Sequence, residues 1–472
     1  MDKKRFYITT TLPYVNAEPH IGFALEIVQA DVLARWQKLD GDEVVFNFGT
    51  DEHGQKIYQK ALELGLDPKA YCDEYAAKFE GLKKALNLSY TNFIRTTDEY
   101  HIKAAQEFWK RCEANGDIYK KNYKVKYCVG CELEKTDSEL VENRCPVHPN
   151  KELEIREEEN YFFRFSKYQQ PLMDYYNKHP DFVIPDERYR EIKAFVKNGL
   201  EDFSVSRLKS KMPWGISIPG DENQVIYVWF DALINYISTL GWPENKDNFN
   251  NYWPGVQVAG KDNLRQQSAM WQAMLLSAGL PNSKQIFIHG FMTNGGQKIS
   301  KSMGNTVDPI ELCEKYGTDA VRFYLLSQIH PWEDSDFTME KFINSYNSFL
   351  ANGLGNLVSR IAKLCDTSGL IFEQEKLTFN ESVAKYLTEY KFNEAMMIIW
   401  LGLNGCDQLI EKEKPWQLEG DKLKDVLIDL IRKLKFSAYS LLPFLPETAE
   451  KILRQFGTDK IKAEAPLFPR IK

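Results

Sequence analysis

Residues 19–26 read "PHIGFALE" and follow the run "RFYITTTLPYVNAE" (5–18), which is typical of a buried strand that leaves through a proline turn. His20 and Gly22 therefore stand where a strand passes into a helix. At such a junction the first helical N–H groups attract phosphate, and a glycine lets a ligand approach the backbone. Alone the tripeptide is a weak signal, because a histidine in this place also serves simply to start a helix.

The chain around this segment alternates short β-rich runs with helical patterns up to about residue 115. The runs "RFYITTT" (5–11) and "EVVFNFGT" (43–50) are separated by helical patterns such as 22–39 and 67–86. This alternation predicts a parallel α/β sheet. It resumes with the segments "QVIYVWFDALINYI" (224–237), "VQVAGKDN" (256–263) and "KQIFIHGFMT" (284–293).

The region from residue 119 to about residue 212 has a different character. It is basic and aromatic and surrounds a cysteine cluster, which indicates a module inserted into the sheet. Beyond residue 336 apolar residues recur at helical spacing with almost no strand signal, which predicts a helical bundle.

Composition limits the class of protein. The chain has 472 residues, of which 43% are hydrophobic and 27% charged, as expected for a globular protein of several units. The longest strongly apolar run, "AMMIIWLGL" (395–403), is too short to cross a bilayer, and the N-terminus lacks the apolar stretch of a signal peptide. We therefore expect a cytoplasmic protein. The net charge of −7 argues against a generally basic nucleic-acid surface, although a local basic patch would still hold a polyanion.

The cysteine cluster has the most specific spacing in the chain. "CVGC" carries Cys128 and Cys131, and "CPVH" carries Cys145 and His148 after thirteen intervening residues. Tetrahedral zinc takes N and S ligands in such pairs, and a full set of four leaves no position for water or substrate. The sequence therefore predicts one structural Zn²⁺; the alternative is a pair of unrelated turn cysteines beside a surface histidine.

A second cluster, "TNGGQKISKSMGN" (293–305), places Lys298 and Lys301 directly after a Gly-Gly pair. Two ammonium groups on a glycine-hinged loop can close over a polyphosphate and neutralise a leaving pyrophosphate. Taken alone, the lysines fit a solvated basic loop equally well. Paired with the "HIG" tripeptide, across an α/β fold that carries an insertion, the combination becomes specific.

The two clusters resemble the HIGH and KMSKS signatures of class I aminoacyl-tRNA synthetases, and along essentially the whole chain the sequence is most similar to the methionyl-tRNA synthetase family. The segments that carry the resemblance are "TLPYVNAEPHIG" (11–22), "GTDEHGQKI" (49–57), the cysteine knuckle, "VWFDALINY" (228–236), "GKDN" (260–263), "HGFMTNGGQKISKS" (289–302), "GTDAVRFYLL" (317–326), "NGLGNLVSR" (352–360) and "EKPW" (413–416).

The resemblance implies a reaction without a protein nucleophile. The carboxylate of L-methionine attacks the α-phosphate of ATP, and the terminal ribose of tRNA(Met) then takes the methionyl group from the adenylate. Positioning and charge stabilisation are the tasks of such an enzyme. The catalytic residues implied by the match are His20, Gly22, Lys298 and Lys301, and the ATP-binding residues are His20, Gly22, Gly260, Asp262, His289 and Lys301. Mg²⁺ is expected to accompany ATP.

For the amino acid, the resemblance implies a pocket made of Leu12, Tyr14, Asp51, Trp229, Ala232, Tyr236 and Gln267. Asp51 can pair with an ammonium group, and aromatic side chains can enclose a polarizable thioether. From pattern alone, core filling by the aromatic residues and a helix N-cap at Asp51 are equally ordinary explanations.

Three positions in the C-terminal bundle, Asn356, Arg360 and Trp416, match the family's anticodon-reading residues. Asn and Arg can hydrogen-bond unstacked bases, and Trp can stack on them. The alternative is a purely structural role, in which Asn356 and Arg360 form the polar edge of an amphipathic helix and Trp416 is a packing residue.

The sequence departs from the family pattern at four positions. Phe23 stands where the fourth signature residue is histidine, and Leu233 occupies a position that is often proline. Asn263 and Gln267 replace residues that are commonly Ile and His. These changes leave open how the chain contacts ATP and methionine.

The resulting expectation is an α/β fold with a Rossmann-type parallel sheet, an inserted zinc-knuckle module and a C-terminal helical bundle that binds the anticodon. The expected segments are the first half of the catalytic domain (1–115), the inserted module (116–222), the second half (223–290), a signature-loop and stem-contact region (291–340) and the anticodon-binding bundle (341–472). With no further module after the bundle, we expect a monomer.

The leading hypothesis is an enzyme that ligates methionine to tRNA. The alternative is a catalytically silent synthetase-like protein that binds tRNA or an amino acid as a regulator. A synthetase for another amino acid, such as cysteine or leucine, is disfavoured by the knuckle, by "VWFDA" (228–232) and by the lack of a long editing insertion.

Overall fold

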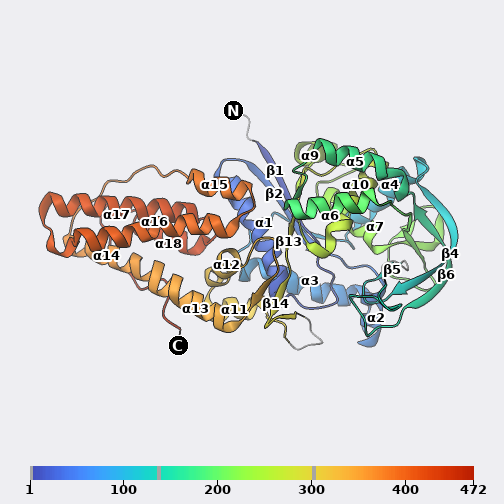
Figure 1. Ribbon diagram of the computed structural model, residues 1–472, viewed down its shortest axis with the longest axis horizontal. Coiled ribbons are helices and arrows are strands. Elements are labelled where there is room, and N and C mark those ends of the chain that lie inside the picture. Colours follow the sequence, from blue (N-terminus) through green and yellow to red (C-terminus); the bar gives the residue numbers. More distant parts are fainter. Residues whose placement is uncertain (1–3, 136–139, 300–304, 472) are drawn as a thin grey trace.

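The computed structural model describes residues 4–135, 140–299 and 305–471. The molecule is elongated (Figure 1): a helical bundle, orange to red, forms one end, the N-terminal strands lie in the middle, and a β-rich module coloured cyan to green forms the other end. Among the described residues, no helix combines the length and the apolar character that a membrane span requires.

The central sheet is entirely parallel where its strands are described. Its strands follow the order β3 (Asn92–Arg95), β2 (Glu43–Thr50), β1 (Arg5–Thr10), β12 (Val256–Gly260), β13 (Gln285–His289) and β7 (Val183–Ile184). This is the strand order of a Rossmann fold, in which ligands bind beyond the carboxyl ends of the strands where the order reverses. Here that point lies between β1 and β12, so the predicted fold class is confirmed.

The helices of the α/β part cover this sheet. They are α1 (Ile21–Leu39), α2 (Gln55–Glu63), α3 (Pro68–Ala85), α4 (Glu99–Ala114), α7 (Val228–Ala232), α8 (Asn235–Ser238), α9 (Lys246–Tyr252) and α10 (Trp271–Ser277), with the short 3₁₀ turn η3 (Lys261–Asn263) and the π-helical turn η4 (Gln266–Met270) that leads into α10. The helices predicted at 22–39 and 67–86 agree with α1 and α3 to within one residue at each end.

Helix α1 begins as the opening segment predicts. His20 has an extended backbone (φ −135°, ψ 168°), and its Nδ1 accepts a hydrogen bond from the backbone N–H of Gly22 at 3.1 Å. His20 is therefore the N-cap, which satisfies one of the N–H groups that a helix leaves unpaired at its start.

The inserted region builds two antiparallel sheets. One runs in the order β5 (Leu133–Lys135), β4 (Ile118–Cys128), β6 (Glu154–Phe163) and β8 (Phe203–Ser204), and the other in the order β10 (Ser217–Ile218), β11 (Asp221–Ile226) and β9 (Ser206–Leu208). The turn η2 (Phe165–Tyr168) and helices α5 (Gln169–Lys178) and α6 (Asp186–Lys197) complete the region. Strand β7 lies within the range 116–222 but pairs with β13, so this range also supplies an edge strand to the central sheet.

A small sheet follows the central one. Strand β14 (Met292–Asn294) pairs antiparallel with β15 (Gln297–Lys298) and parallel with β16 (Ser335–Phe337). Helices α11 (Pro309–Tyr316), α12 (Thr318–Ser327) and α13 (Met339–Ser345) connect it to the bundle.

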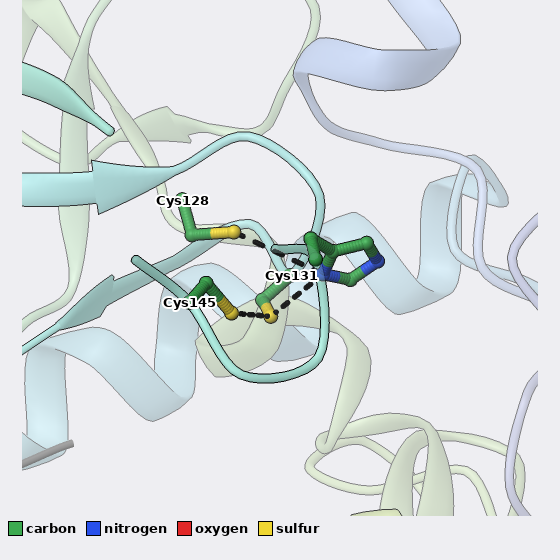
Figure 2. Close-up of side chains that lie close together, drawn as sticks. Cys128, Cys131 and Cys145 are labelled. Atoms are coloured by element: carbon green, nitrogen blue, oxygen red, sulfur yellow. Dashed lines mark hydrogen bonds between the residues drawn. The ribbon is translucent and has the colours of Figure 1, made fainter. Parts of the chain in front are cut away.

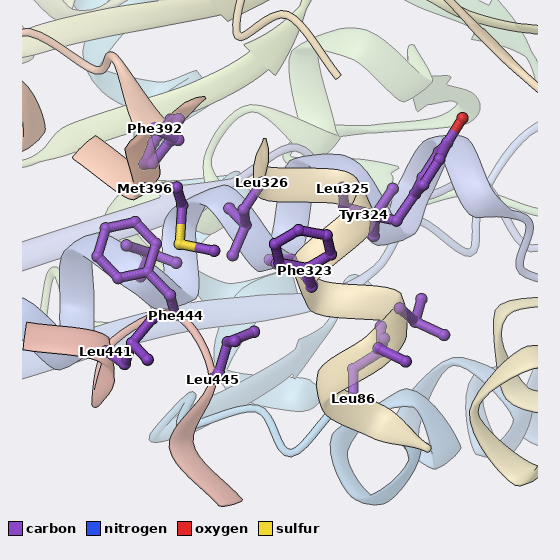
Figure 3. Packing of buried hydrophobic residues seen from close by; sticks show 14 of the residues in the cluster. Leu86, Phe323, Tyr324, Leu325, Leu326, Phe392, Met396, Leu441, Phe444 and Leu445 are labelled. Atoms are coloured by element: carbon purple, nitrogen blue, oxygen red, sulfur yellow. The ribbon is translucent and has the colours of Figure 1, made fainter. Parts of the chain in front are cut away.

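The C-terminal bundle is helical, as predicted. It contains η6 (Tyr346–Gly355), α14 (Asn356–Ser368), α15 (Glu381–Thr388), α16 (Phe392–Glu413), the turn η7 (Pro415–Gln417), α17 (Gly420–Leu441) and α18 (Pro446–Gln455). Its core is continuous with that of the α/β part. Figure 3 shows the junction, where Phe323 and Leu326 of α12 lie among Met396 of α16 and Phe444 after α17. This shared core fixes the bundle against the sheet.

Candidate active site

A cavity of about 260 Å³ opens at the carboxyl ends of β1 and β2 and reaches α7, α8 and η3. All the residues that the resemblance assigns to methionine line it: Leu12, Tyr14, Asp51, Trp229, Ala232, Tyr236 and Gln267. Phe23, Asp262 and Asn263 line it as well. Residues as distant in the chain as Leu12 and Gln267 thus line one cavity at the position where a Rossmann fold binds its ligands.

Asp51 places a buried carboxyl group in this cavity. Its side chain is buried, and its Oδ1 has no hydrogen-bond partner among the described residues. Burial raises the pKa of Asp51 well above its usual value, and the nearby carboxylates of Asp231 and Glu132 raise it further. The carboxyl group accepts one backbone hydrogen bond, from His53, but a buried oxygen left unpaired is costly. The site is therefore suited to a ligand that brings a positive charge and hydrogen-bond donors.

Tyr236 and Gln267 form the buried wall of the cavity. Gln267 Nε2 donates to the Tyr236 hydroxyl at 2.6 Å, and Gln257 Nε2 donates to Gln267 Oε1 at 3.2 Å. The Gln267 amide, which stands where the resemblance implies a histidine, therefore has a fixed orientation. Trp229 is half-buried on α7 and adds an aromatic surface.

The signature segment lies beside this cavity. The rings of His20 and Phe23 are in contact, with centroids 4.5 Å apart, and Phe23 meets Phe79 of α3 edge to face at 5.7 Å. Burial lowers the pKa of His20 to about 4, so the imidazole is neutral at pH 7. Because its Nδ1 accepts from Gly22, the remaining ring hydrogen is on Nε2, which is the atom that can donate to a ligand.

A buried acid bridges the two halves of the sheet. Glu26 of α1 accepts hydrogen bonds at Oε1 from the backbone N–H (2.8 Å) and the hydroxyl (2.6 Å) of Thr11. Its Oε2 lies 2.9 Å from Nε2 of His289, at the end of β13. Burial lowers the pKa of His289, but the hydrogen bond to Glu26 outweighs it, so the pKa is raised overall. Gly260 ends β12 between these groups, and Asp262 follows it in η3.

The lysine cluster is described in part. Lys298 ends β15, where it pairs with Thr293 of β14. Lys301 lies outside the described residues.

A histidine pair lies behind Asp51. Asp231 of α7 is fully buried, with Oδ2 2.7 Å from Nδ1 of His53 and Oδ1 2.7 Å from Nε2 of His101. Burial would raise the pKa of Asp231, but these two histidines hold it below its usual value. The pair therefore keeps a charged carboxylate close to Asp51.

The cysteine knuckle brings together all four predicted ligands, whose ligand atoms lie within 4.8 Å of one another. Sγ of Cys131 is 3.4 Å from Sγ of Cys145, and Nδ1 of His148 is 3.2 Å from Sγ of Cys131 and 3.9 Å from Sγ of Cys128. In Figure 2 Cys128 and Cys131, from one turn, converge with Cys145 from another segment. Ligands around a tetrahedral zinc ion stand about 3.4–3.8 Å apart, so this group could hold such a metal.

The backbone of the knuckle supports the same conclusion. A Cβ atom on Gly130 would lie 2.4 Å from Cγ of His148. The glycine between the two cysteines therefore lets the imidazole approach the thiols. The chemistry of the set, three thiols and one imidazole, is the kind that structural zinc prefers.

In the bundle, Asn356 is exposed and Arg360 is half-buried one turn further along α14. Arg360 Nη1 donates to Asp407 Oδ1 of α16 at 3.0 Å. Trp416 lies on a different element, η7, and 59% of its surface is exposed. An exposed tryptophan on a tight turn is available for stacking.

Sequence reasoning missed Glu26 and Glu132. Glu132 directly follows Cys131, yet it lines the cavity and accepts from the Tyr14 hydroxyl at 3.4 Å. Both glutamates act through partners more than a hundred residues away, Glu26 on His289 and Glu132 on Tyr14, and no local pattern indicates such pairs.

The chain matches a family model described as tRNA synthetases class I (M) over residues 6–153 and 130–362. A methionine–tRNA ligase of Nostoc sp. is 42% identical over 96% of this chain and 90% of its own length. A methionine–tRNA ligase of Thermotoga maritima is also 42% identical, over 97% of this chain and 76% of its own length.

Solved structures agree with the sequence relatives. A methionyl-tRNA synthetase of Mycobacterium tuberculosis in complex with methionyl-adenylate superposes with a TM-score of 0.93, at 34% identity, over 99% of this chain and 100% of that one. The free form of the Mycobacterium tuberculosis enzyme gives a TM-score of 0.86 at 31% identity, over 100% of this chain and 99% of that one.

Proposed function

This chain belongs to the methionyl-tRNA synthetase family of class I tRNA synthetases, and we propose that the cavity around Asp51 is the place where it activates methionine. The chain is a ligase that joins methionine to tRNA. In the first step a carboxylate oxygen of methionine bonds to the α-phosphorus of ATP, and pyrophosphate leaves. In the second, a ribose hydroxyl of the tRNA 3′-terminal adenosine bonds to the methionyl carbonyl carbon, and AMP leaves.

The observation that carries the assignment of the cavity is the buried, unpartnered Oδ1 of Asp51. An α-ammonium group would satisfy this carboxylate and neutralise it, which removes the cost of leaving it buried. Trp229 and Tyr236 would then enclose the thioether, with Leu12 and Ala232 completing an apolar surface for a flexible, polarizable side chain.

Gln267 and Tyr14 complete the proposed methionine site. The Gln267 amide is fixed by its neighbours, so it presents a constant polar surface beside the Tyr236 hydroxyl. Tyr14 lines the same cavity, and its backbone forms an isolated parallel bridge with the backbone of Asp51.

For ATP, we propose His20 and Gly22 at the start of α1, with Gly260, Asp262 and His289 at the ends of β12 and β13. The support is positional, because these residues surround the carboxyl ends of β1, β12 and β13. Neutral His20 would donate from Nε2 to a phosphate oxygen. The positive end of the α1 dipole would favour the phosphates at the same place, although the first N–H groups of the helix already bond within the protein. Lys298 and Lys301 would stabilise the pentacoordinate phosphate and the leaving pyrophosphate.

We further propose that the knuckle holds one structural Zn²⁺ and that Mg²⁺ accompanies ATP. The support for zinc is the convergence of Cys128, Cys131, Cys145 and His148. A bound zinc ion would cross-link the turns of the knuckle. The support for Mg²⁺ is the general requirement of a divalent cation to shield the phosphates of ATP.

The tRNA substrate would be tRNA(Met), read by Asn356, Arg360 and Trp416. The exposed Trp416 and Asn356 support this proposal, since unstacked anticodon bases are recognised by stacking and by amide hydrogen bonds. The segments 1–115 and 223–290 would then form the catalytic domain, 116–222 the inserted module, 291–340 the stem-contact region and 341–472 the anticodon-binding bundle.

We also propose that the enzyme works as a monomer in the cytoplasm. The cavity around Asp51 is lined entirely by residues of one chain, so the proposed site needs no second copy. A metal-binding knuckle of unoxidised cysteines fits a reducing compartment, where ATP and tRNA are also found.

The test is ATP–pyrophosphate exchange with purified protein, measured with methionine and with a panel of other amino acids. We expect exchange that depends on methionine and is far weaker with cysteine or leucine. Charging of tRNA(Met) in the presence of ATP should follow. Exchange that is absent with methionine, in a protein that still binds tRNA, would favour a silent regulator instead.

A further inference from the structure

Glu132 occupies an unusual place between two parts of the molecule. It follows Cys131 in the knuckle and has a left-handed backbone (φ 52°), and only 6% of its surface is exposed. It lines the cavity around Asp51 and also a second cavity of about 580 Å³. Glu132 therefore forms part of the wall between the proposed methionine site and the space beyond it.

The side-chain hydrogen bonds of Glu132 run to two residues that line the cavity around Asp51. Its Oε1 accepts from the Tyr14 hydroxyl (3.4 Å) and from the backbone N–H of Lys56 (2.9 Å). Its own backbone carbonyl accepts from the hydroxyl of Tyr227, next to α7. Lys56 Nζ in turn donates to the carbonyl of Gly130 at 2.6 Å, so a second bond ties the knuckle to α2.

The bond to Lys56 acts as a helix cap. Gly54, the residue before α2, has φ 114° and no side chain with which to cap the helix. The carboxylate of Glu132 supplies the missing acceptor from 76 residues away. Gly54 also leaves room for Tyr14, because a Cβ atom at this position would lie 2.3 Å from the Tyr14 hydroxyl.

We propose that Glu132 is a positioning residue of the methionine site, which holds the Tyr14 hydroxyl and the first turn of α2 in place and ties both to the cysteine knuckle. Two of its hydrogen bonds reach the segments on either side of Asp51: one goes to Tyr14, whose backbone pairs with Asp51, and one goes to Lys56, five residues after Asp51 in the sequence. Loss of the carboxylate would free the Tyr14 ring and loosen the start of α2. The expected consequence is weaker binding of methionine with little change in the turnover of bound substrate.

This inference rests on the proposed methionine site, so the native protein is measured first in methionine-dependent ATP–pyrophosphate exchange. Glu132→Ala and Glu132→Gln are then compared, each with and without Tyr14→Phe. Glu142→Ala is the matched control, because Glu142 lies on the same knuckle, has a similar backbone (φ 51°) and is exposed.

We expect Glu132→Ala to raise the methionine KM about tenfold while kcat stays within about threefold, the size expected for one lost hydrogen bond to a charged group. Glu132→Gln keeps an acceptor oxygen and should recover most of the affinity. In the Tyr14→Phe background the effect of Glu132→Ala should shrink to about threefold or less, because the shared bond is already gone. Glu142→Ala should behave as the native protein.

Equal effects of Glu132→Ala with and without Tyr14→Phe would overturn the proposal, and so would a Glu132→Gln variant as impaired as Glu132→Ala. Metal content is measured for every variant. One further outcome would overturn the proposal: Glu132→Ala loses its metal, while Glu132→Gln keeps its metal but binds methionine tenfold more weakly than the native protein. The charge of Glu132, and not its position, would then matter. Absence of exchange in the native protein would instead refute the proposed function.

Discussion

Arg322 and Asp31 form a fully buried ion pair, with 2.8 Å between Nη1 of the arginine and Oδ2 of the aspartate. The pair joins α12 to α1, the helix that starts at the His20 signature. Arg322 also donates to the backbone carbonyls of Leu86 (3.1 Å), Pro443 (2.9 Å) and Phe444 (2.7 Å). One guanidinium therefore connects α12 to α1, to the segment after α3 and to the end of α17. Leu86 and Phe444, two of these partners, are labelled in the core of Figure 3.

Replacing Arg322 should destabilise the whole protein. Arg322→Met leaves a buried carboxylate and three carbonyls without this partner, and breaking a buried pair in this way costs about 3–5 kcal/mol. The free energy of unfolding in urea measures the loss. The exposed pair of Arg432 with Glu375, at 2.7 Å, is the control, and Arg432→Met should stay near the native value. Equal losses in the two variants would contradict a special role for the buried pair.

The contact between His20 and Phe23 predicts a pH dependence. Burial lowers the pKa of His20 to about 4, whereas an unfolded histidine titrates near 6.5. The stability that neutral His20 contributes is therefore fully present above about pH 6.5 and is lost as the pH falls toward 4. Below that, protonated Nδ1 can no longer accept from Gly22.

Phe23→Ala removes the ring that covers His20 and should move the His20 pKa back toward 6.5. ATP–pyrophosphate exchange in this variant should then decline as the pH drops from 7 to 5, while the native protein shows no loss from this histidine over that range. Phe23→Tyr keeps a ring and serves as the control. Identical pH profiles for native protein and Phe23→Ala would show that Phe23 does not shield His20.

Much of the fold follows from local sequence patterns. The alternation of buried runs and helical patterns predicts β1, β2, α1 and α3, because parallel strands and their covering helices leave strong periodic signals. The knuckle follows from ligand spacing alone. Strand β7 does not, since it is two residues long and gains its place only by pairing with β13, about a hundred residues later.

The candidate site, like the fold, was predictable from the sequence only in part. The residues matched to the family's methionine pocket line one cavity, but the partners that hold them were not predictable. Glu26, Glu132 and the histidines around Asp231 depend on contacts between distant segments, and a buried acid leaves no periodic signal in the sequence. The effect of Phe23 also required the structure, because its contact with Phe79 crosses from α1 to α3.

Asp51→Asn should separate binding from stability. The variant keeps the shape of the side chain but loses the charge that would pair with the methionine ammonium, so kcat/KM for methionine should fall roughly 10- to 100-fold. The midpoint of urea unfolding should not fall, because burial and nearby carboxylates raise the pKa of Asp51 and disfavour its charge. Asp40→Asn, at an exposed position, is the control. An unchanged kcat/KM would rule out the ammonium contact.

Metal analysis should find about one zinc per native chain and none after Cys128→Ser together with Cys145→Ser. Gly130→Ala should weaken metal retention during dialysis against a chelator, because the new Cβ would lie 2.4 Å from Cγ of His148. Gly405→Ala, where a Cβ meets open space, is the control. Two zinc ions per chain, or full retention in Gly130→Ala, would contradict the proposed coordination.

Lys301→Ala should slow adenylation far more than it weakens methionine binding. An ammonium group that acts on charge developing at the pyrophosphate stabilises the transition state more than the ground state, so its loss should lower kcat about 10²- to 10³-fold with a small change in the methionine KM. Lys298→Ala should have the smaller effect of an assisting charge. Both quantities come from ATP–pyrophosphate exchange at varied methionine. If kcat in Lys301→Ala stayed native while KM rose, the lysine would bind substrate without stabilising the departure of pyrophosphate.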